Sequence, residues 1–99
     1  MAGIVYHPKV PSEAREFLGY YEGVSRELGD KFWTELSLAI AKAGKHPKRH
    51  HFDQLGAGLR RSNLKSFPVH FLFRVFPYHV RITTVRHDRC RPSDGIRRR

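Results

Sequence analysis

The sequence has very little cysteine and no long hydrophobic run. Cys90 is the single cysteine among 99 residues, which excludes an internal disulfide framework. No apolar stretch approaches the ~20 residues that a membrane-spanning helix needs, and the first residues lead into a strand pattern instead of a signal peptide. These absences predict a soluble cytoplasmic protein that has no membrane partner.

Acidic residues are scarce in the second half of the chain. The whole sequence holds 19 Lys and Arg against 9 Asp and Glu, a formal net charge of +10. Residues 1–46 contain six residues of each sign, so residues 47–99 carry the entire excess, with 13 basic residues against Asp53, Asp88 and Asp94. Such an excess of positive charge attracts polyanions. We therefore expect a nucleic acid or an acidic protein as partner.

Apolar residues are frequent enough to build one folded domain. Hydrophobic residues make up 39% of the sequence and aromatic residues 12%, which excludes a disordered chain. The length suits a single domain over residues 1–99. Residues 91–99 contain Pro92, Gly95 and three terminal arginines, and we expect them to form a mobile basic tail.

The first half of the chain predicts a strand followed by two helices. Residues 4–7 are β-branched or aromatic and end before a proline, as in a short strand. Apolar residues then recur every three or four positions, from a helix cap at Ser12 to Gly29, and again from a cap at Asp30 to Gly44. The very short connection between the two segments requires an antiparallel helical hairpin.

The second half predicts strands. Between residues 67 and 87 the hydrophobic period changes to two, with a turn near Pro77 and Tyr78, as in an antiparallel hairpin. The expected core face consists of Val69, Phe71, Phe73, Val75, Val80, Ile82 and Thr84. Residues 59–64 form a weaker strand pattern. The fold class is therefore α+β, a two-layer β-α-α-β-β-β domain in which the N-terminal helical hairpin packs on a mainly antiparallel four-stranded sheet.

Two stretches of sequence, together with this order of elements, carry a family resemblance. The first is GLRRSNLKSFP at residues 58–68, leading into FLFRV at 71–75, and the second is VRHDRCRP at 85–92. The chain resembles the RelE/ParE superfamily, the toxins of type II toxin–antitoxin systems. Both stretches are similar to the ParE-like branch, often described as plasmid stabilisation proteins.

The resemblance implies a partner and a target. ParE-type members poison DNA gyrase, and an acidic cognate antitoxin neutralises such a toxin in a toxin–antitoxin hetero-oligomer. The leading hypothesis is that this chain traps gyrase by binding. The expected target contacts are Arg60, Arg61, Lys65, Arg74, His87, Arg89 and Arg91. A further alternative is a non-toxic basic domain that binds only a nucleic acid or the antitoxin.

RelE-type members cleave ribosome-bound mRNA, and this gives the main alternative function. Cleavage needs a proton acceptor and positive charge around the reacting phosphate. His87 is the candidate base, and Arg60, Arg74 and Arg81 are the candidate transition-state stabilisers. Two departures weaken this alternative: His70 stands where RelE-type toxins typically have an arginine, and no tyrosine follows the last strand.

The sequence predicts no cofactor and no metal. His46, His50, His51 and Asp53 are close in sequence, but their spacing matches no recognised metal site and no cysteine pair completes one. Cys90 lies among arginines, which should lower the pKa of its thiol.

Overall fold

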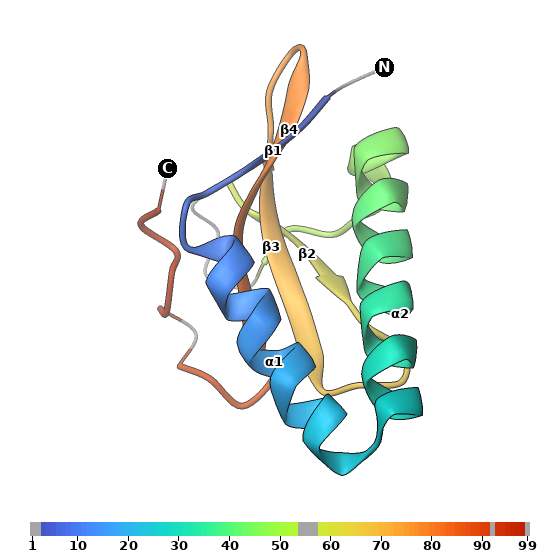
Figure 1. Ribbon diagram of the computed structural model, residues 1–99. Coiled ribbons are helices and arrows are strands. Elements are labelled where there is room, and N and C mark those ends of the chain that lie inside the picture. Colours follow the sequence, from blue (N-terminus) through green and yellow to red (C-terminus); the bar gives the residue numbers. More distant parts are fainter. Residues whose placement is uncertain (1–2, 54–57, 92, 99) are drawn as a thin grey trace.

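Two helices pack against one face of a four-stranded sheet (Figure 1). The computed structural model describes residues 3–53, 58–91 and 93–98. The elements are β1 (Gly3–Tyr6), α1 (Val10–Val24), α2 (Arg26–Lys45), the short 3-10 helix η1 (Pro47–Arg49), β2 (Arg60–Asn63), β3 (Val69–Val75) and β4 (His79–His87). The predicted α+β class and the order of its elements are confirmed.

The sheet is mixed but mostly antiparallel. Its strand order is β1-β4-β3-β2, in which β1 runs parallel to β4 and the other pairs are antiparallel. The chain between these two parallel strands contains both helices, β2 and β3. Both helices lie on the same face of the sheet (Figure 1). The opposite face is left for side chains of β2, β3 and β4.

The two helices are separated by one residue, Ser25. Its backbone is extended (φ −163°, ψ 151°), and its Oγ accepts a hydrogen bond from the backbone N–H of Leu28 at 3.0 Å. The predicted break at Gly29 and Asp30 was therefore wrong. Gly29 instead lies buried inside α2, where a Cβ would clash with the Glu22 Cγ, so the glycine permits the close approach of the helices.

The predicted start of the first helix was also wrong. The helix begins at Val10, with Pro11 in its first turn, where a missing N–H costs nothing. Ser12 does not cap it, because its Oγ donates a hydrogen bond to the Lys9 carbonyl at 2.9 Å. The second helix ends at Lys45, close to the predicted end.

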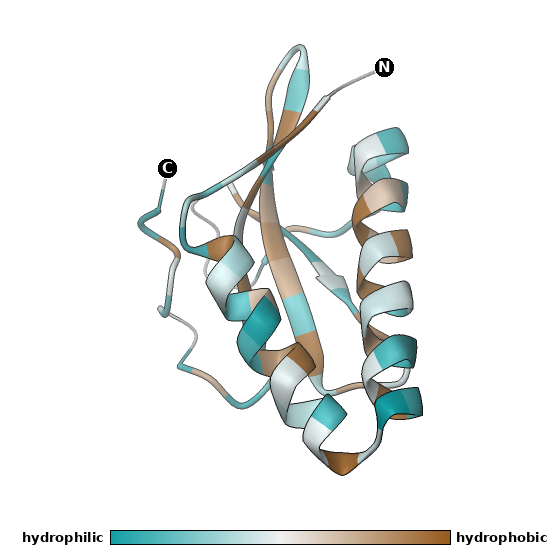
Figure 2. Cartoon of the chain, in the orientation of Figure 1, coloured by the Kyte–Doolittle hydropathy of each residue, from teal (hydrophilic) through white to brown (hydrophobic). Residues whose placement is uncertain are grey.

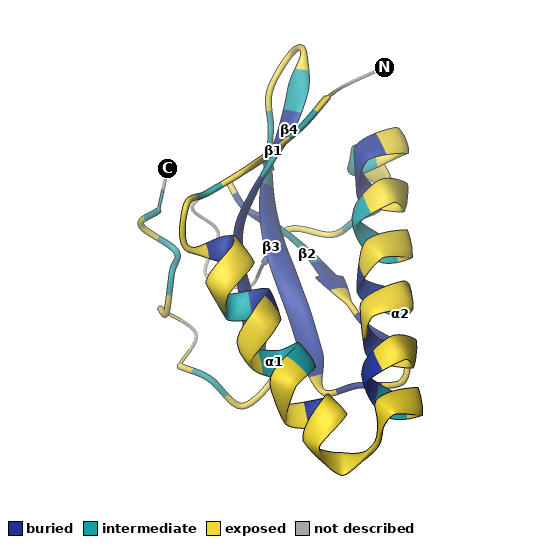
Figure 3. Ribbon diagram, in the orientation of Figure 1, coloured by how far each residue is buried: buried dark blue, intermediate teal, exposed yellow. Residues whose placement is uncertain are grey.

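The main core lies between the helices and the sheet and is rich in aromatic rings. Phe32 and Phe71 are fully buried, and Tyr21 and Phe67 are less than a tenth exposed. The Phe67 ring lies 4.7 Å from that of Tyr21 and 5.2 Å from that of Phe32, both edge-on. Much of β3 is hydrophobic (Figure 2), and burial is greatest along β3 and on the sides of the helices that face it (Figure 3).

A bulge in the β3–β4 pair changes which residues face the core. Leu72 pairs with Thr84 but Phe73 pairs with Ile82, so Thr83 is an extra residue. The alternation of β4 therefore reverses at Thr83. Val85 joins the core, and the prediction that Thr84 would lie there was wrong.

Candidate functional site

The face of the sheet opposite the helices carries arginines from three strands. In the pairing register Arg74 lies opposite Arg81, and Arg86 lies opposite His70. β2 contributes Arg61 to the same face. Because side chains alternate along a strand, these residues share the face that the helices leave open. We call the four basic residues the open-face arginines: Arg61, Arg74, Arg81 and Arg86.

Two carboxylates compensate two of these arginines. Asp53 is only 6% exposed, and its Oδ1 lies 3.8 Å from a guanidinium nitrogen of both Arg61 and Arg86. Asp88 lies 3.7 Å from Arg61 and 2.7 Å from the Nδ1 of His70. One continuous ion network thus joins five side chains of β2, β3, β4 and the adjoining loops, and its two carboxylates balance its two guanidinium groups. Its members are Asp53, Arg61, His70, Arg86 and Asp88.

His70 is the centre of this network. Arg86 Nε donates to His70 Nε2 at 2.8 Å, so the ring proton lies on Nδ1 and is donated to Asp88. The His70 side chain is 1% exposed, and burial lowers its pKa, although the hydrogen bond to Asp88 partly opposes that effect. The ring is therefore neutral, with both nitrogens engaged.

Residues 93–98 lie against the open face and against α1. Arg86 Nη1 donates to the Asp94 carbonyl at 2.7 Å. Arg98 Nη1 donates to Glu13 Oε2 of α1 at 2.7 Å. The segment runs beside α1 on the side away from α2 (Figure 1). The mobility of the tail stays a prediction, and residues 92 and 99 lie outside the described residues.

Two predicted target contacts line a pocket between α2 and β2. Arg61 and Lys65 lie there with Lys42 and Arg49, in a cavity of about 460 Å³. Glu35 is the one carboxylate in its lining, and its Oε2 accepts a hydrogen bond from the backbone N–H of Ser66 at 3.0 Å. The pocket therefore combines several positive charges with one engaged negative charge.

The other predicted contacts differ in accessibility. Arg60 is half-buried, donates to the His50 carbonyl at 2.8 Å and lies 4.0 Å above the Phe52 ring. Arg89 and Arg91, in contrast, are exposed beyond the end of β4. Arg89 and Arg91 are thus accessible to a partner, while Arg60 is tied to the loop before β2.

The structure does not bring the three candidate catalytic residues together. Arg74 and Arg81 are cross-strand neighbours on the open face, and Arg74 Nη2 also donates to the Ile96 carbonyl at 3.4 Å. His87 lies six residues beyond Arg81, a separation of about 20 Å along a strand. It pairs with Val69 of the core face, so it lies on the other side of the sheet.

The ion network was not predicted from the sequence. One feature could have indicated it: Asp53 and Asp88 are two of only three acids after residue 46. Isolated acids in such a basic segment are natural partners for arginines that alternation places on one face. Cys90 also differs from expectation, since partial burial raises the pKa of its thiol and outweighs the nearby Arg86 charge.

The described residues offer neither a metal site nor a membrane-spanning helix. Within residues 3–53, 58–91 and 93–98, no three His, Cys, Asp or Glu side chains are placed to hold a metal ion. Asp53 in particular is engaged with arginines. The helices in this part of the chain lack the combination of length and apolar character needed to cross a membrane.

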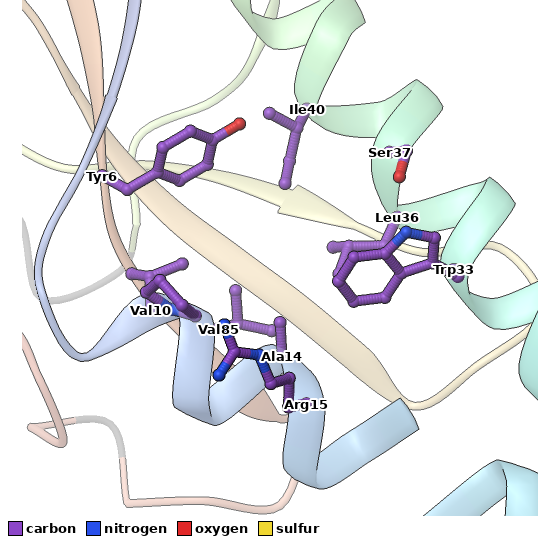
Figure 4. Close-up of a pocket in the computed structure, with 10 residues that line it drawn as sticks. Tyr6, Val10, Ala14, Arg15, Trp33, Leu36, Ser37, Ile40 and Val85 are labelled. Atoms are coloured by element: carbon purple, nitrogen blue, oxygen red, sulfur yellow. The ribbon is translucent and has the colours of Figure 1, made fainter. Parts of the chain in front are cut away.

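An apolar groove lies between the two helices. It has a volume of about 380 Å³, and its floor includes Leu36 and Ile40 of α2. Trp33 and Tyr6, which are 43% and 44% exposed, project from opposite sides, and Arg15 lies at its edge (Figure 4). Large rings left this exposed beside a concave apolar floor are typical of a binding groove.

Comparison with known proteins supports the fold. No family model matches the sequence, and none of the curated proteins is similar enough to count as a match. Among solved structures, the chain is similar to one from "Chromosomal ParDE TA system from P. aeruginosa", with a TM-score of 0.78 and 15% identity. The similarity covers 88% of this chain and 96% of that chain. The ParE-like fold expected from the resemblance is therefore confirmed.

Proposed function

We propose that this protein is the toxin of a type II toxin–antitoxin pair and that it arrests growth by trapping DNA gyrase. The similarity to a chain of a ParDE toxin–antitoxin structure supports the first part of the proposal. The second part depends on one observation, the separation of His87 from Arg74 and Arg81. A toxin that acts by binding needs no assembled group for proton transfer, whereas one that cleaves RNA does.

The burial of His70 and Arg86 also favours binding over cleavage. His70 is 1% exposed and Arg86 is 7% exposed, and each is already bonded within the ion network. Neither can contact an RNA phosphate without breaking those bonds. On this proposal the contacts with the gyrase complex come chiefly from the exposed residues Lys65, Arg89 and Arg91.

Residues that are less exposed contribute less to the target contact. Arg60, Arg61 and Arg74 each use part of their guanidinium groups in contacts within the protein. They raise the local potential around the exposed residues, which favours association with an acidic surface or with enzyme-bound DNA. His87 lies at the end of β4, beside Arg89, whose backbone N–H donates to its Nδ1 at 3.0 Å.

The cognate antitoxin, on this proposal, docks in the apolar groove. An amphipathic helix or strand would place apolar side chains against Trp33 and Leu36. Its acidic face would then lie near Arg15. A partner with this chemistry would cover the exposed rings and lower the net charge of the complex.

Expression of the chain without a partner tests the proposal. We expect growth arrest, loss of supercoiling by purified gyrase, and cellular mRNA that stays intact in primer extension. Arg89→Ala combined with Arg91→Ala should relieve the inhibition of gyrase. The matched control, Arg26→Ala combined with Lys31→Ala, removes the same charge from exposed positions of α2 and should not.

Two results would contradict the proposal. Ribosome-dependent cuts in mRNA that disappear in His87→Ala would establish the endonuclease alternative. Absence of growth arrest at confirmed expression would favour the non-toxic basic domain.

A further inference from the structure

The tip of the β3–β4 hairpin exposes aromatic rings. β3 ends at Val75 and β4 begins at His79, and the backbone N–H of Phe76 donates to the His79 carbonyl at 2.9 Å to close the turn. The Tyr78 side chain is 88% exposed and that of Phe76 is 38% exposed. The tip projects beyond the last turn of α2 (Figure 1). Tyr78 thus makes little contact with its own protein.

Part of the tip is an ordered aromatic surface. The rings of Phe76 and His79 are stacked, with centroids 4.6 Å apart and planes within 13° of each other. Because the turn and the first residue of β4 are held by a backbone hydrogen bond, this pair loses little freedom when a ligand stacks on it. Planar ligands with an extended π-face are the natural partners of such a surface.

Two lysines lie beside the tip, and the neighbouring segments contain no acid. Lys45 and Lys48 line a cavity of about 460 Å³ whose other wall includes Phe76 and the residues beside it. Residues 36–52 and 54–87 contain no Asp or Glu, and Asp53 between them is held in the ion network. β1, the remaining element at this end of the molecule, has no acid either. Anions therefore meet no local repulsion here.

The geometry points to a binding site for single-stranded nucleic acid at this end of the protein, formed by Phe76, Tyr78, His79, Lys45 and Lys48. Unpaired bases stack on the rings of the tip, and the adjoining phosphates contact the two lysines. The site lies outside the proposed gyrase contacts and the antitoxin groove, and it does not depend on the chain being a toxin.

The rings favour a single strand over two other anionic partners. In duplex DNA the bases are stacked on each other and their faces are not available to an external ring. An acidic protein would be attracted by Lys45 and Lys48 but would not need the stacked pair of Phe76 and His79. A single strand alone uses both the rings and the charges.

Fluorescence anisotropy with labelled oligothymidylate and oligouridylate of about 12 nucleotides tests the rings. Tyr78→Ala should weaken binding about 5- to 150-fold, the usual effect of losing one base-stacking ring. Tyr78→Phe keeps the ring and should bind like the original protein. The matched control is Tyr20→Ala, which removes a tyrosine that is 69% exposed on α1 and should leave affinity unchanged.

The salt dependence of binding tests the lysines. Lys45→Ala combined with Lys48→Ala should reduce the slope of log affinity against log salt by about 1.4, since each phosphate contact on a single strand contributes about 0.7. Arg26→Ala combined with Lys31→Ala removes the same net charge from exposed positions elsewhere on α2 and should change the slope less.

Several outcomes would overturn the site. The site is wrong if the original protein binds neither oligonucleotide, or if Tyr78→Ala and Tyr20→Ala lose affinity equally. It is also wrong if a duplex of the same length binds as tightly as the single strand. Equal competition by a polyglutamate peptide would likewise show that charge alone is recognised. Preference for either of the two oligonucleotides, lost in Tyr78→Ala, supports the site.

Discussion

Replacing Asp53 with asparagine removes the charge that two arginines share, and the cost can be worked out from the structure. At 3.8 Å the attraction between Asp53 and one arginine is about 4 kcal/mol for an effective dielectric constant of ~20. Desolvation offsets part of this for the Arg86 pair, and solvent screens the Arg61 pair, since that side chain is 32% exposed.

The variant nevertheless leaves Arg86 nearly buried beside a neutral group. Loss of one partner from a buried pair costs about 3 kcal/mol or more. For a domain of this size that loss lowers the melting temperature by about 12 to 24 °C. Thermal unfolding followed by circular dichroism measures it, in 0.05 M and again in 1 M NaCl, because burial should make the loss persist at high salt.

Asp30→Asn is the matched control. Asp30 is an exposed residue of α2, and its replacement makes the same change in net charge. Its effect on the free energy of unfolding should stay within about 0.5 kcal/mol. If Asp53→Asn melts within a few degrees of Asp30→Asn, then the ion network does not stabilise the open face and the reasoning is wrong.

Three further predictions concern stability. The lowered pKa of His70 means that the unfolded chain takes up a proton first as the pH falls, so the free energy of unfolding should decrease below about pH 6.5, and urea unfolding at pH 7.5 and 5.5 should show a smaller decrease for His70→Gln. Gly29→Ala should destabilise by about 1 to 3 kcal/mol because its Cβ would meet Glu22, whereas Gly19→Ala, with open space around it, should stabilise by about 0.5 to 1 kcal/mol in thermal melts. Ser25→Ala removes the cap of α2 and should cost about 1 kcal/mol in urea unfolding, and no loss would show that the cap is dispensable.

Local patterns in the sequence were sufficient to predict the order of the elements. Helical periodicity and strand alternation depend on residues a few positions apart, and both are strong here. The exact break between the helices was missed because Gly29 and Asp30 resemble a helix end as well as Ser25 does. Only the packed structure shows that Gly29 is needed for the approach to Glu22.

The candidate site was predicted less well because it depends on contacts between distant parts of the chain. A single bulged residue, Thr83, reverses the alternation of β4 and is invisible in the period-two pattern. The partners of Arg61 and Arg86 come from the loops before β2 and after β4. Basic residues that look equivalent in the sequence therefore divide into compensated and exposed ones.

The strand order has a consequence for how the protein is made. β1 pairs only with β4 in this sheet, and β4 is the last strand to be synthesised. Both helices can therefore form on the ribosome well before the sheet that they cover. β1 has no strand partner until β4 has been translated. Pairing between such distant segments is slow to form. The aromatic side chains that the helices turn toward the sheet therefore stay exposed to solvent during this interval.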